Sequence, residues 1–218
     1  MLKIGTVIDD KYKILSKVGQ GGMSVVYLAL NERANKTWAV KEVRKDGRRD
    51  FSTVKQRLIT ETEILKSLRH KYLPSIVDVI EDEDVFILVM DYIEGKSLME
   101  FLREGVSGED RSMAVRDVLC WGTQLCEVLY YLHTRQEPIV YRDMKPSNIM
   151  LKPDGEISLI DFGTARIFKE GNVDDTTCLG TPGYAAPEQY GGHGQSCPQS
   201  DIYGLGATLH HLITGRNP

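Results

Sequence analysis

A glycine-rich stretch near the N-terminus, residues 19–26, restricts the fold most, because apolar, β-branched segments lie on both sides of it. A dinucleotide-binding fingerprint needs a strand before its glycines and a helix after them, whereas a second strand follows here. No Gly-Lys-Ser or Gly-Lys-Thr follows, which excludes a Walker-type loop. The pattern predicts a hairpin whose glycines, Gly19, Gly21 and Gly22, either form a flexible turn or let backbone amides approach a phosphate.

Strand-like segments dominate the first part of the chain, and helical periodicity dominates the second. The strand candidates are rich in β-branched and apolar residues and cover residues 12–19, 25–30, 37–43 and 85–90. Residues 51–68 are predicted to be a helix. A second, amphipathic helix ends near His133, and a third, over 202–213, is apolar nearly all round and expected to be buried. The pattern predicts an α+β fold, with a strand-rich lobe before a helix-rich one and a ligand cleft between them.

Composition excludes several classes of protein. The 218 residues carry a net charge of −4, with a pI near 5.8, so nothing favours binding to nucleic acid or to an anionic membrane. The four cysteines form no C-x-x-C pair, which argues against a zinc site and fits a reducing compartment. The densest apolar run, residues 85–90, is far too short to cross a bilayer. We expect a soluble, cytoplasmic chain, with a membrane anchor beyond residue 218 left open.

A lysine within the third strand candidate indicates an anion nearby. Lys41 follows apolar residues, and a cation inside such a strand must either extend to solvent or meet a negative group. The helix that follows offers two carboxylates. Glu61 shares a face with Leu58 and Leu65, where an unpaired carboxylate is costly, whereas Glu63 points elsewhere. We therefore expect Glu61 to pair with Lys41, although each residue alone also fits an ordinary surface charge.

Two further constellations carry oxygen ligands at the ends of short strand candidates. Residues 141–148 read Tyr-Arg-Asp-Met-Lys-Pro-Ser-Asn, and residues 161–163 read Asp-Phe-Gly. A lone aspartate in a loop is usually a turn former. Here three groups with carboxylate or amide oxygens, which Mg²⁺ takes together with phosphate oxygens, are ordered around short strands. They are Asp143, Asn148 and Asp161.

These four constellations occur in the order that marks protein kinases. Over residues 10–218 the chain resembles the eukaryotic-type (Hanks-type) serine/threonine protein kinases, in particular those of bacteria. The resemblance implies a bilobal kinase fold, with residues 1–92 as an N-lobe built on a small antiparallel sheet and one helix. Residues 93–218 would be a mostly helical C-lobe, incomplete at its C-terminal end. The implied activity is transfer of the γ-phosphate of ATP, with magnesium, to serine or threonine hydroxyls of proteins in signal transduction.

The resemblance also implies roles for individual residues. Lys41 would hold the α- and β-phosphates while paired with Glu61, and residues 19–26 would cover the phosphates. Asp143 would orient the substrate hydroxyl and accept its proton, and Lys145 would steady the γ-phosphate, as in serine/threonine-directed members. The two magnesium ligands would be Asn148 and Asp161.

Adenine would be bound by apolar side chains and by the backbone that joins the lobes. Met90 matches the gatekeeper position, and Asp91 and Tyr92 match the hinge whose backbone pairs with the adenine edge. Asp201, at the start of the last helix, would anchor the loop that carries Asp143. The side chains that would sandwich the base are Val18, Val26, Ala39 and Met150.

The segment between Asp-Phe-Gly and Ala-Pro-Glu matches an activation loop. We expect autophosphorylation at Thr176 or Thr177, with Arg142 receiving the phosphate through charge-assisted hydrogen bonds and thereby ordering the loop. An ordinary polar loop is the alternative. Autophosphorylation between two copies would involve self-association. Thr181 is expected instead to contact Asp143 and the lysine two residues beyond it, and to shape the substrate site.

The sequence departs from the family pattern in three places. Ser24 stands where a third glycine is usual, and Tyr141 replaces the commoner histidine. The chain also ends at Pro218, where the family continues with helices that supply an arginine for Glu188, so Glu188 would lack its partner. We expect low stability, oligomerisation or weak activity from the isolated chain, with a pseudokinase or inactive nucleotide-binding module as the alternative function. Residues 181–188 suit docking of a protein chain, which disfavours a small-molecule phosphotransferase.

Overall fold

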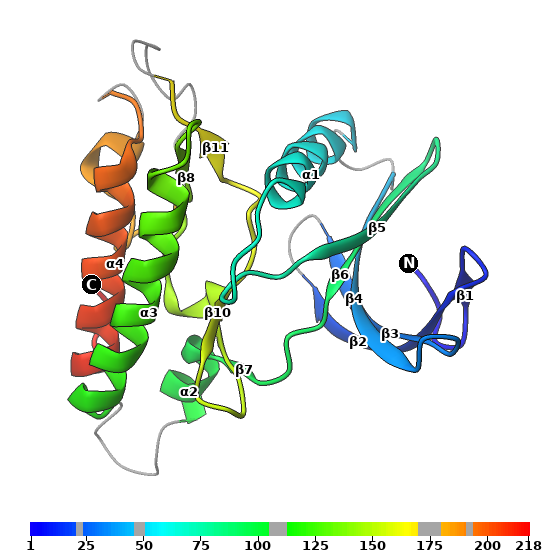
Figure 1. The fold of residues 1–218 in the computed structure, drawn as a ribbon, viewed down its shortest axis with the longest axis horizontal. Helices are drawn as coiled ribbons and strands as arrows, with labels where there is room; N and C mark the ends of the chain where they lie inside the picture. Colours follow the sequence, from blue (N-terminus) through cyan, green and yellow to red (C-terminus); the bar gives the residue numbers. More distant parts are fainter. Residues whose placement is uncertain (21–23, 46–50, 105–112, 170–179, 191–193) are drawn as a thin grey trace. The chain divides into compact units, whose positions relative to one another are not determined.

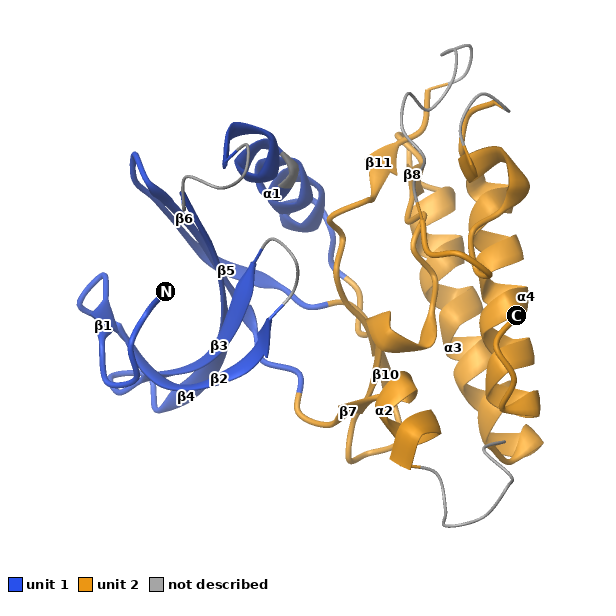
Figure 2. Cartoon of the chain, turned by 180° about the vertical axis from the view of Figure 1, so that it is seen from behind, with its two compact units in different colours: residues 1–69, 74–93 blue, residues 70–73, 94–218 orange. Residues whose placement is uncertain are grey.

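The structure is a computed structural model that describes residues 1–20, 24–45, 51–104, 113–169, 180–190 and 194–218. The chain divides into two compact units, coloured separately in Figure 2. Unit 1 consists of Met1–Arg69 and Pro74–Ile93, and unit 2 of His70–Leu73 and Glu94–Pro218. The α+β class predicted from the sequence is confirmed, since unit 1 is built on a sheet and unit 2 mainly on helices (Figure 1).

In its described residues, unit 1 is a six-stranded antiparallel sheet with one helix, and its strand order is β1-β2-β3-β4-β6-β5. The bounds of β2, β3, β4, β6 and α1 lie within two residues of those predicted from periodicity, whereas β1 and β5 were not predicted. The hairpin predicted around the glycines joins β2 and β3, with Gly19 opposite Val26. The elements are β1 (Val7–Ile8), β2 (Tyr12–Gln20), β3 (Val25–Asn31), β4 (Lys36–Arg44), α1 (Phe51–Lys66), β5 (Ile76–Glu81) and β6 (Val85–Asp91).

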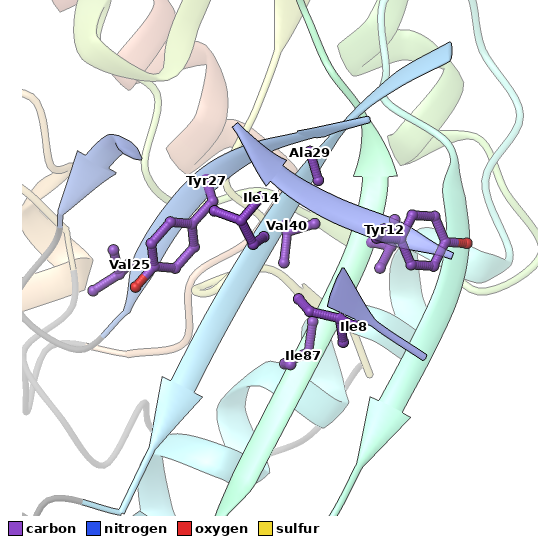
Figure 3. Packing of buried hydrophobic residues seen from close by; sticks show 9 residues of the cluster. Ile8, Tyr12, Ile14, Val25, Tyr27, Ala29, Val40 and Ile87 are labelled. Atoms are coloured by element: carbon purple, nitrogen blue, oxygen red, sulfur yellow. The ribbon is translucent and has the colours of Figure 1, made fainter. Parts of the chain in front are cut away.

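Both faces of this sheet are covered, which explains why β6 is apolar throughout. Successive side chains of a strand point to opposite faces. Phe86 and Leu88 pack with Leu58 of α1, whereas Ile87 and Val89 belong to a separate cluster. That cluster is drawn in Figure 3 and comprises Ile8, Tyr12, Ile14, Val25, Tyr27, Ala29, Val40, Ile87 and Val89.

In unit 2, the two long helices α3 (Val115–His133) and α4 (Pro198–Thr214) lie side by side, as both views in Figures 1 and 2 show. Their approach is close at Gly122, where an added Cβ would lie 3.3 Å from Leu209 Cδ2. His70–Leu73 belongs to this unit, in part because Leu159 donates its amide to the Tyr72 carbonyl at 2.8 Å. The elements are β7 (Lys96–Ser97), α2 (Leu98–Glu104), α3 (Val115–His133), β8 (Ile139–Val140), η1 (Pro146–Asn148), β9 (Ile149–Leu151), β10 (Ile157–Leu159), β11 (Arg166–Ile167), η2 (Pro187–Tyr190) and α4 (Pro198–Thr214).

Helix α4 corrects one expectation. It was predicted to be buried all round, but Ile202 and Tyr203 are 54% and 50% exposed, because the described residues cover only one of its faces. That face carries Leu205, Thr208 and Leu212, which are buried. Apolar periodicity identifies which residues are suited to burial, but not what covers them. Within the described ranges, no helix combines the length and apolar character that crossing a bilayer requires.

Candidate active site

Unit 1 pairs the strand lysine with a carboxylate of α1. The Lys41 ammonium lies 2.9 and 2.8 Å from the two carboxylate oxygens of Glu61. Lys41 is opposite Leu88 in the sheet, and directly opposite residues share a face, so its side chain points to the face that α1 covers. Glu63 lies on the exposed side of α1 and pairs with Lys66 at 3.4 Å. Helical spacing thus correctly predicted that Glu61, and not Glu63, pairs with Lys41.

Three of the residues expected around adenine, Val26, Ala39 and Met90, share the Lys41 face of unit 1. Val26 is opposite Lys41, and Ala39 is opposite Met90. Because Ala39 and Lys41 are two residues apart on one strand, all four side chains lie on one face of the sheet. Val18 is 47% exposed at the end of β2. Gly21 and Gly22 lie outside the described residues.

The expected hinge residue Asp91 is held by a partner that sequence reasoning missed. Its amide donates to the Ser75 carbonyl at 3.0 Å, and its carboxylate accepts from the Ser75 amide at 3.0 Å and from Lys36 at 3.3 Å. The Asp91 amide is therefore engaged within unit 1 and is not available to an adenine edge. No local pattern marks Ser75, because the pairing joins residues 16 positions apart.

Asp143 lies at the centre of a polar cluster in unit 2. Its carboxylate accepts the Thr181 hydroxyl at 2.8 Å and the Asn148 amide at 2.9 Å, and lies 2.7 Å from the Lys145 ammonium. Lys145 also donates to the Thr181 hydroxyl at 2.7 Å, which closes a triangle of three side chains. Asp143 and Lys145 remain 12% and 21% exposed, so the cluster is accessible to a bound group.

The backbone before Asp143 is fixed by a buried carboxylate on α4. Asp201 is 1% exposed and accepts the amides of Tyr141 and Arg142 at 2.8 and 2.7 Å. His133 contributes a third hydrogen bond to this carboxylate at 2.8 Å, and sequence reasoning did not identify it. Arg142 has φ +71°, in the left-handed region that few L-residues adopt, so these contacts hold a strained backbone in place.

The expected magnesium ligands also lie in unit 2. The Ile160 amide donates to the Asn148 carbonyl at 2.9 Å, which brings the residue after Ile160, Asp161, beside Asn148. Among the described residues, no three His, Cys, Asp or Glu side chains gather into a group that could hold a metal alone. One carboxylate and one amide still fit Mg²⁺, which takes hard oxygen ligands and shares its coordination with phosphate oxygens and water.

Tyr141 has a clear structural role where it replaces the usual histidine. Its ring packs edge-on against Phe162, with centroids 5.1 Å apart. Its hydroxyl donates to the carbonyl of Ile160, immediately before Asp161. Burial, and then the charges of Asp161 and Asp143, raise the pKa of Tyr141 well above its ordinary value, so the hydroxyl stays protonated and can donate.

The regulatory residues are only partly described. Thr176 and Thr177 lie outside the described residues. The Arg142 guanidinium donates to the Thr164 carbonyl. Glu188, which was expected to lack its arginine partner, accepts a hydrogen bond from the hydroxyl of Ser200, in the first turn of α4, and sequence reasoning missed this contact.

The two units and these polar groups define a protein kinase catalytic domain. Residues 12–218 match the protein kinase domain family, and the chain belongs to that family.

Several curated proteins are similar to this chain. Serine/threonine-protein kinase PrkC of Bacillus subtilis is 35% identical over 216 residues, covering 99% of this chain and 32% of that protein. Serine/threonine-protein kinase PknA of a Nostoc species is 33% identical over 226 residues, covering 97% of this chain and 38% of that protein. The chain therefore spans about a third of the length of these relatives.

Proposed function

We propose that this chain transfers the γ-phosphate of ATP to serine or threonine hydroxyls of protein substrates. The observation that carries the proposal is the triangle of Asp143, Lys145 and Thr181, in which a carboxylate, an ammonium and a hydroxyl meet within 2.7–2.8 Å. The names of the bacterial relatives support serine/threonine specificity. The proposed substrates are proteins, because residues 181–188 suit an extended chain.

In this mechanism, unit 1 supplies the cation for the nucleotide. Lys41 binds the α- and β-phosphate oxygens, and Glu61 keeps its ammonium oriented. Ala39, Val26 and Met90 share the Lys41 face and offer apolar surface to adenine. The backbone of Tyr92 and the Asp91 carbonyl offer polar groups to the adenine edge, and Met150 of unit 2 offers further apolar contact.

Unit 2 supplies the groups that act on the acceptor. Asp143 accepts a hydrogen bond from the substrate hydroxyl, orients its oxygen for in-line attack and takes its proton as the new O–P bond forms. The bond between the γ-phosphorus and the bridging oxygen breaks, and ADP leaves. Lys145 neutralises charge on the transferred group. Asn148 and Asp161 would hold Mg²⁺, which supplies charge neutralisation on the phosphates when bound.

The test measures nucleotide binding and turnover in parallel. Wild-type protein should bind Mg-ATP and phosphorylate a serine- and threonine-containing protein substrate. Asp143→Asn should retain nucleotide binding but lose about 10³-fold or more in kcat, because no base orients the hydroxyl. Lys41→Met should weaken nucleotide binding. Nucleotide binding without turnover by the wild-type protein would instead support the inactive module.

Activation through the loop forms a separate part of the proposal. Autophosphorylation at Thr176 or Thr177 would place a dianion where the Arg142 guanidinium can bind it by charge-assisted hydrogen bonds. Self-association would let one copy phosphorylate another. Phosphopeptide mapping after incubation with Mg-ATP tests this, and phosphate found only on other residues would contradict it.

A further inference from the structure

Gln189 is a buried neutral side chain that connects two functional segments of unit 2. It lies in η2 and is 2% exposed. Its Nε2 donates to the carbonyl of Arg142 at 2.8 Å, and its Oε1 accepts the Ala186 amide at 2.9 Å. Both ends of the amide therefore hold backbone groups of neighbouring segments.

The carbonyl that Gln189 holds belongs to the peptide that leads directly into Asp143. The amide of Arg142 is fixed by Asp201 at 2.7 Å, and its carbonyl is fixed by Gln189 at 2.8 Å. Arg142 has φ +71°, so this strained residue is held on both sides. The Arg142 carbonyl belongs to the peptide that joins Arg142 to Asp143. A change in the direction of this carbonyl therefore rotates that peptide and moves the Asp143 side chain.

Gln189 also packs against the backbone that leads into Thr181. Gly180 has φ +106°, and an added Cβ there would lie 3.2 Å from Gln189 Nε2 and 3.5 Å from the Arg142 carbonyl oxygen. The same Cβ would lie 2.8 Å from the Ala185 side chain, so a side chain at residue 180 has no room. Gln189 thus touches the segments that position both members of the Thr181–Asp143 hydrogen bond.

We propose that Gln189 is a positioning residue for phosphoryl transfer, which sets the geometry between Asp143 and Thr181 through the Arg142 carbonyl. The inference rests on the proposed kinase activity and adds to it a residue that does not touch nucleotide or substrate. Replacing Gln189 should therefore lower kcat for the acceptor substrate. The affinity for nucleotide should stay close to that of wild type, because the groups of unit 1 dominate it.

The most informative variant is Gln189→Glu in the full-length protein. An ionised carboxylate keeps the acceptor for Ala186 but replaces the donor to the Arg142 carbonyl with a repelling oxygen. At about pH 8, kcat should fall about 10- to 100-fold while the KM for ATP stays within about twofold. Lowering the pH should restore turnover relative to wild type, because the protonated carboxyl can donate to the carbonyl again.

The surroundings set the pH at which the variant recovers. Arg142, Asp143 and Asp201 line the same small cavity as Gln189, and Glu188 is its neighbour in the chain. Burial and the three carboxylates raise the pKa of the introduced carboxyl, and the Arg142 charge opposes them. A loss of packing alone would not recover at low pH, so the pH profile separates positioning from a general structural defect.

Two further variants complete the test. Gln124→Glu is the matched control, since Gln124 is a partly buried glutamine of α3 whose oxygen accepts the Ile157 amide at 2.9 Å. It should leave kcat unchanged both at about pH 8 and at the lower pH.

Gln189→Asn is neutral and too short to reach the Arg142 carbonyl. It should lose turnover without recovery at low pH, and it carries the test if Gln189→Glu does not fold. At about pH 8, wild-type-like kcat in either folded Gln189 variant would overturn the inference while leaving the kinase activity intact. No turnover by the wild-type protein would overturn both.

Discussion

Both carboxylate oxygens of Glu61 lie within 2.9 Å of the Lys41 ammonium. Glu61 is 3% exposed and Lys41 14% exposed, so the pair is largely shielded from water. In such surroundings each charge depends on the other, because an unpaired buried charge is costly. The lysine is thereby held in one orientation on the sheet face that also carries Ala39 and Met90.

Glu61→Gln should therefore weaken use of ATP. The amide cannot balance the Lys41 charge, so the ammonium loses its fixed position, and kcat/KM for ATP should fall about 10- to 100-fold. Steady-state kinetics with varied ATP measure this. Glu63→Gln changes an exposed carboxylate on the same helix and should have no effect. Equal kinetics for the two variants would contradict the assigned role of the pair.

Thr181→Ala should reduce turnover of protein substrate. It removes the hydroxyl that donates to Asp143 at 2.8 Å and accepts from Lys145 at 2.7 Å. We expect a loss of about 10- to 100-fold in kcat/KM for the protein substrate. Thr181→Ser keeps the hydroxyl and should retain most of the activity. A serine variant as impaired as the alanine variant would show that the methyl group, and not the hydroxyl, is what matters.

Local patterns predicted much of the fold. The predicted bounds of helix α1 and strands β3, β4 and β6 agree closely with the observed ones, because side-chain period and β-branched composition are local properties. The choice of Glu61 over Glu63 also came from helical spacing alone. The burial of α4 was overestimated, because spacing does not reveal which neighbour covers an apolar face.

Contacts between distant residues could not be predicted in this way. His133 and Asp201 are 68 positions apart, and Gln189 and Arg142 are 47 apart. Such pairs carry no shared period or spacing, so only the folded backbone brings them together. The hydrogen bond from Ser200 to Glu188 was missed for a related reason, since both residues are ordinary polar groups in the sequence.

Asp201→Asn should destabilise unit 2. The carboxylate accepts from the amides of Tyr141 and Arg142, and an asparagine amide can satisfy only one of them with its oxygen. A buried donor left without a partner should lower the free energy of unfolding by about 1–3 kcal/mol. Urea denaturation measures the change. Asp154→Asn, at an exposed turn, should change it by less than about 0.5 kcal/mol, and similar effects for both variants would argue against the anchoring role.

Protonation of His211 should lower the free energy of unfolding when the pH falls below neutrality. This histidine is 5% exposed and hydrogen-bonds the Tyr184 hydroxyl. Burial, and then the charge of His210, lower the pKa of His211 below its ordinary value. The unfolded chain therefore binds a proton at a higher pH than the folded chain, and the free energy of unfolding should fall between about pH 7.5 and 5.5.

Replacing His211 by glutamine tests this directly. Denaturant unfolding at several pH values should show a shallower pH slope for His211→Gln than for wild type. His70 has a pKa lowered by burial in the same way, so part of the slope should remain. His210→Gln, at an exposed position, should reduce the slope less. If the pH dependence of the free energy of unfolding is unchanged in His211→Gln, groups other than His211 cause the loss of stability at low pH.

The most direct test of the proposed activity follows labelled γ-phosphate from ATP into a protein substrate. Purified wild-type protein with Mg²⁺ should place the label on serine or threonine, and Asp143→Asn at the same concentration should leave the substrate unlabelled. Equal labelling by the two proteins, or a wild-type protein that binds ATP and transfers nothing, would contradict the account.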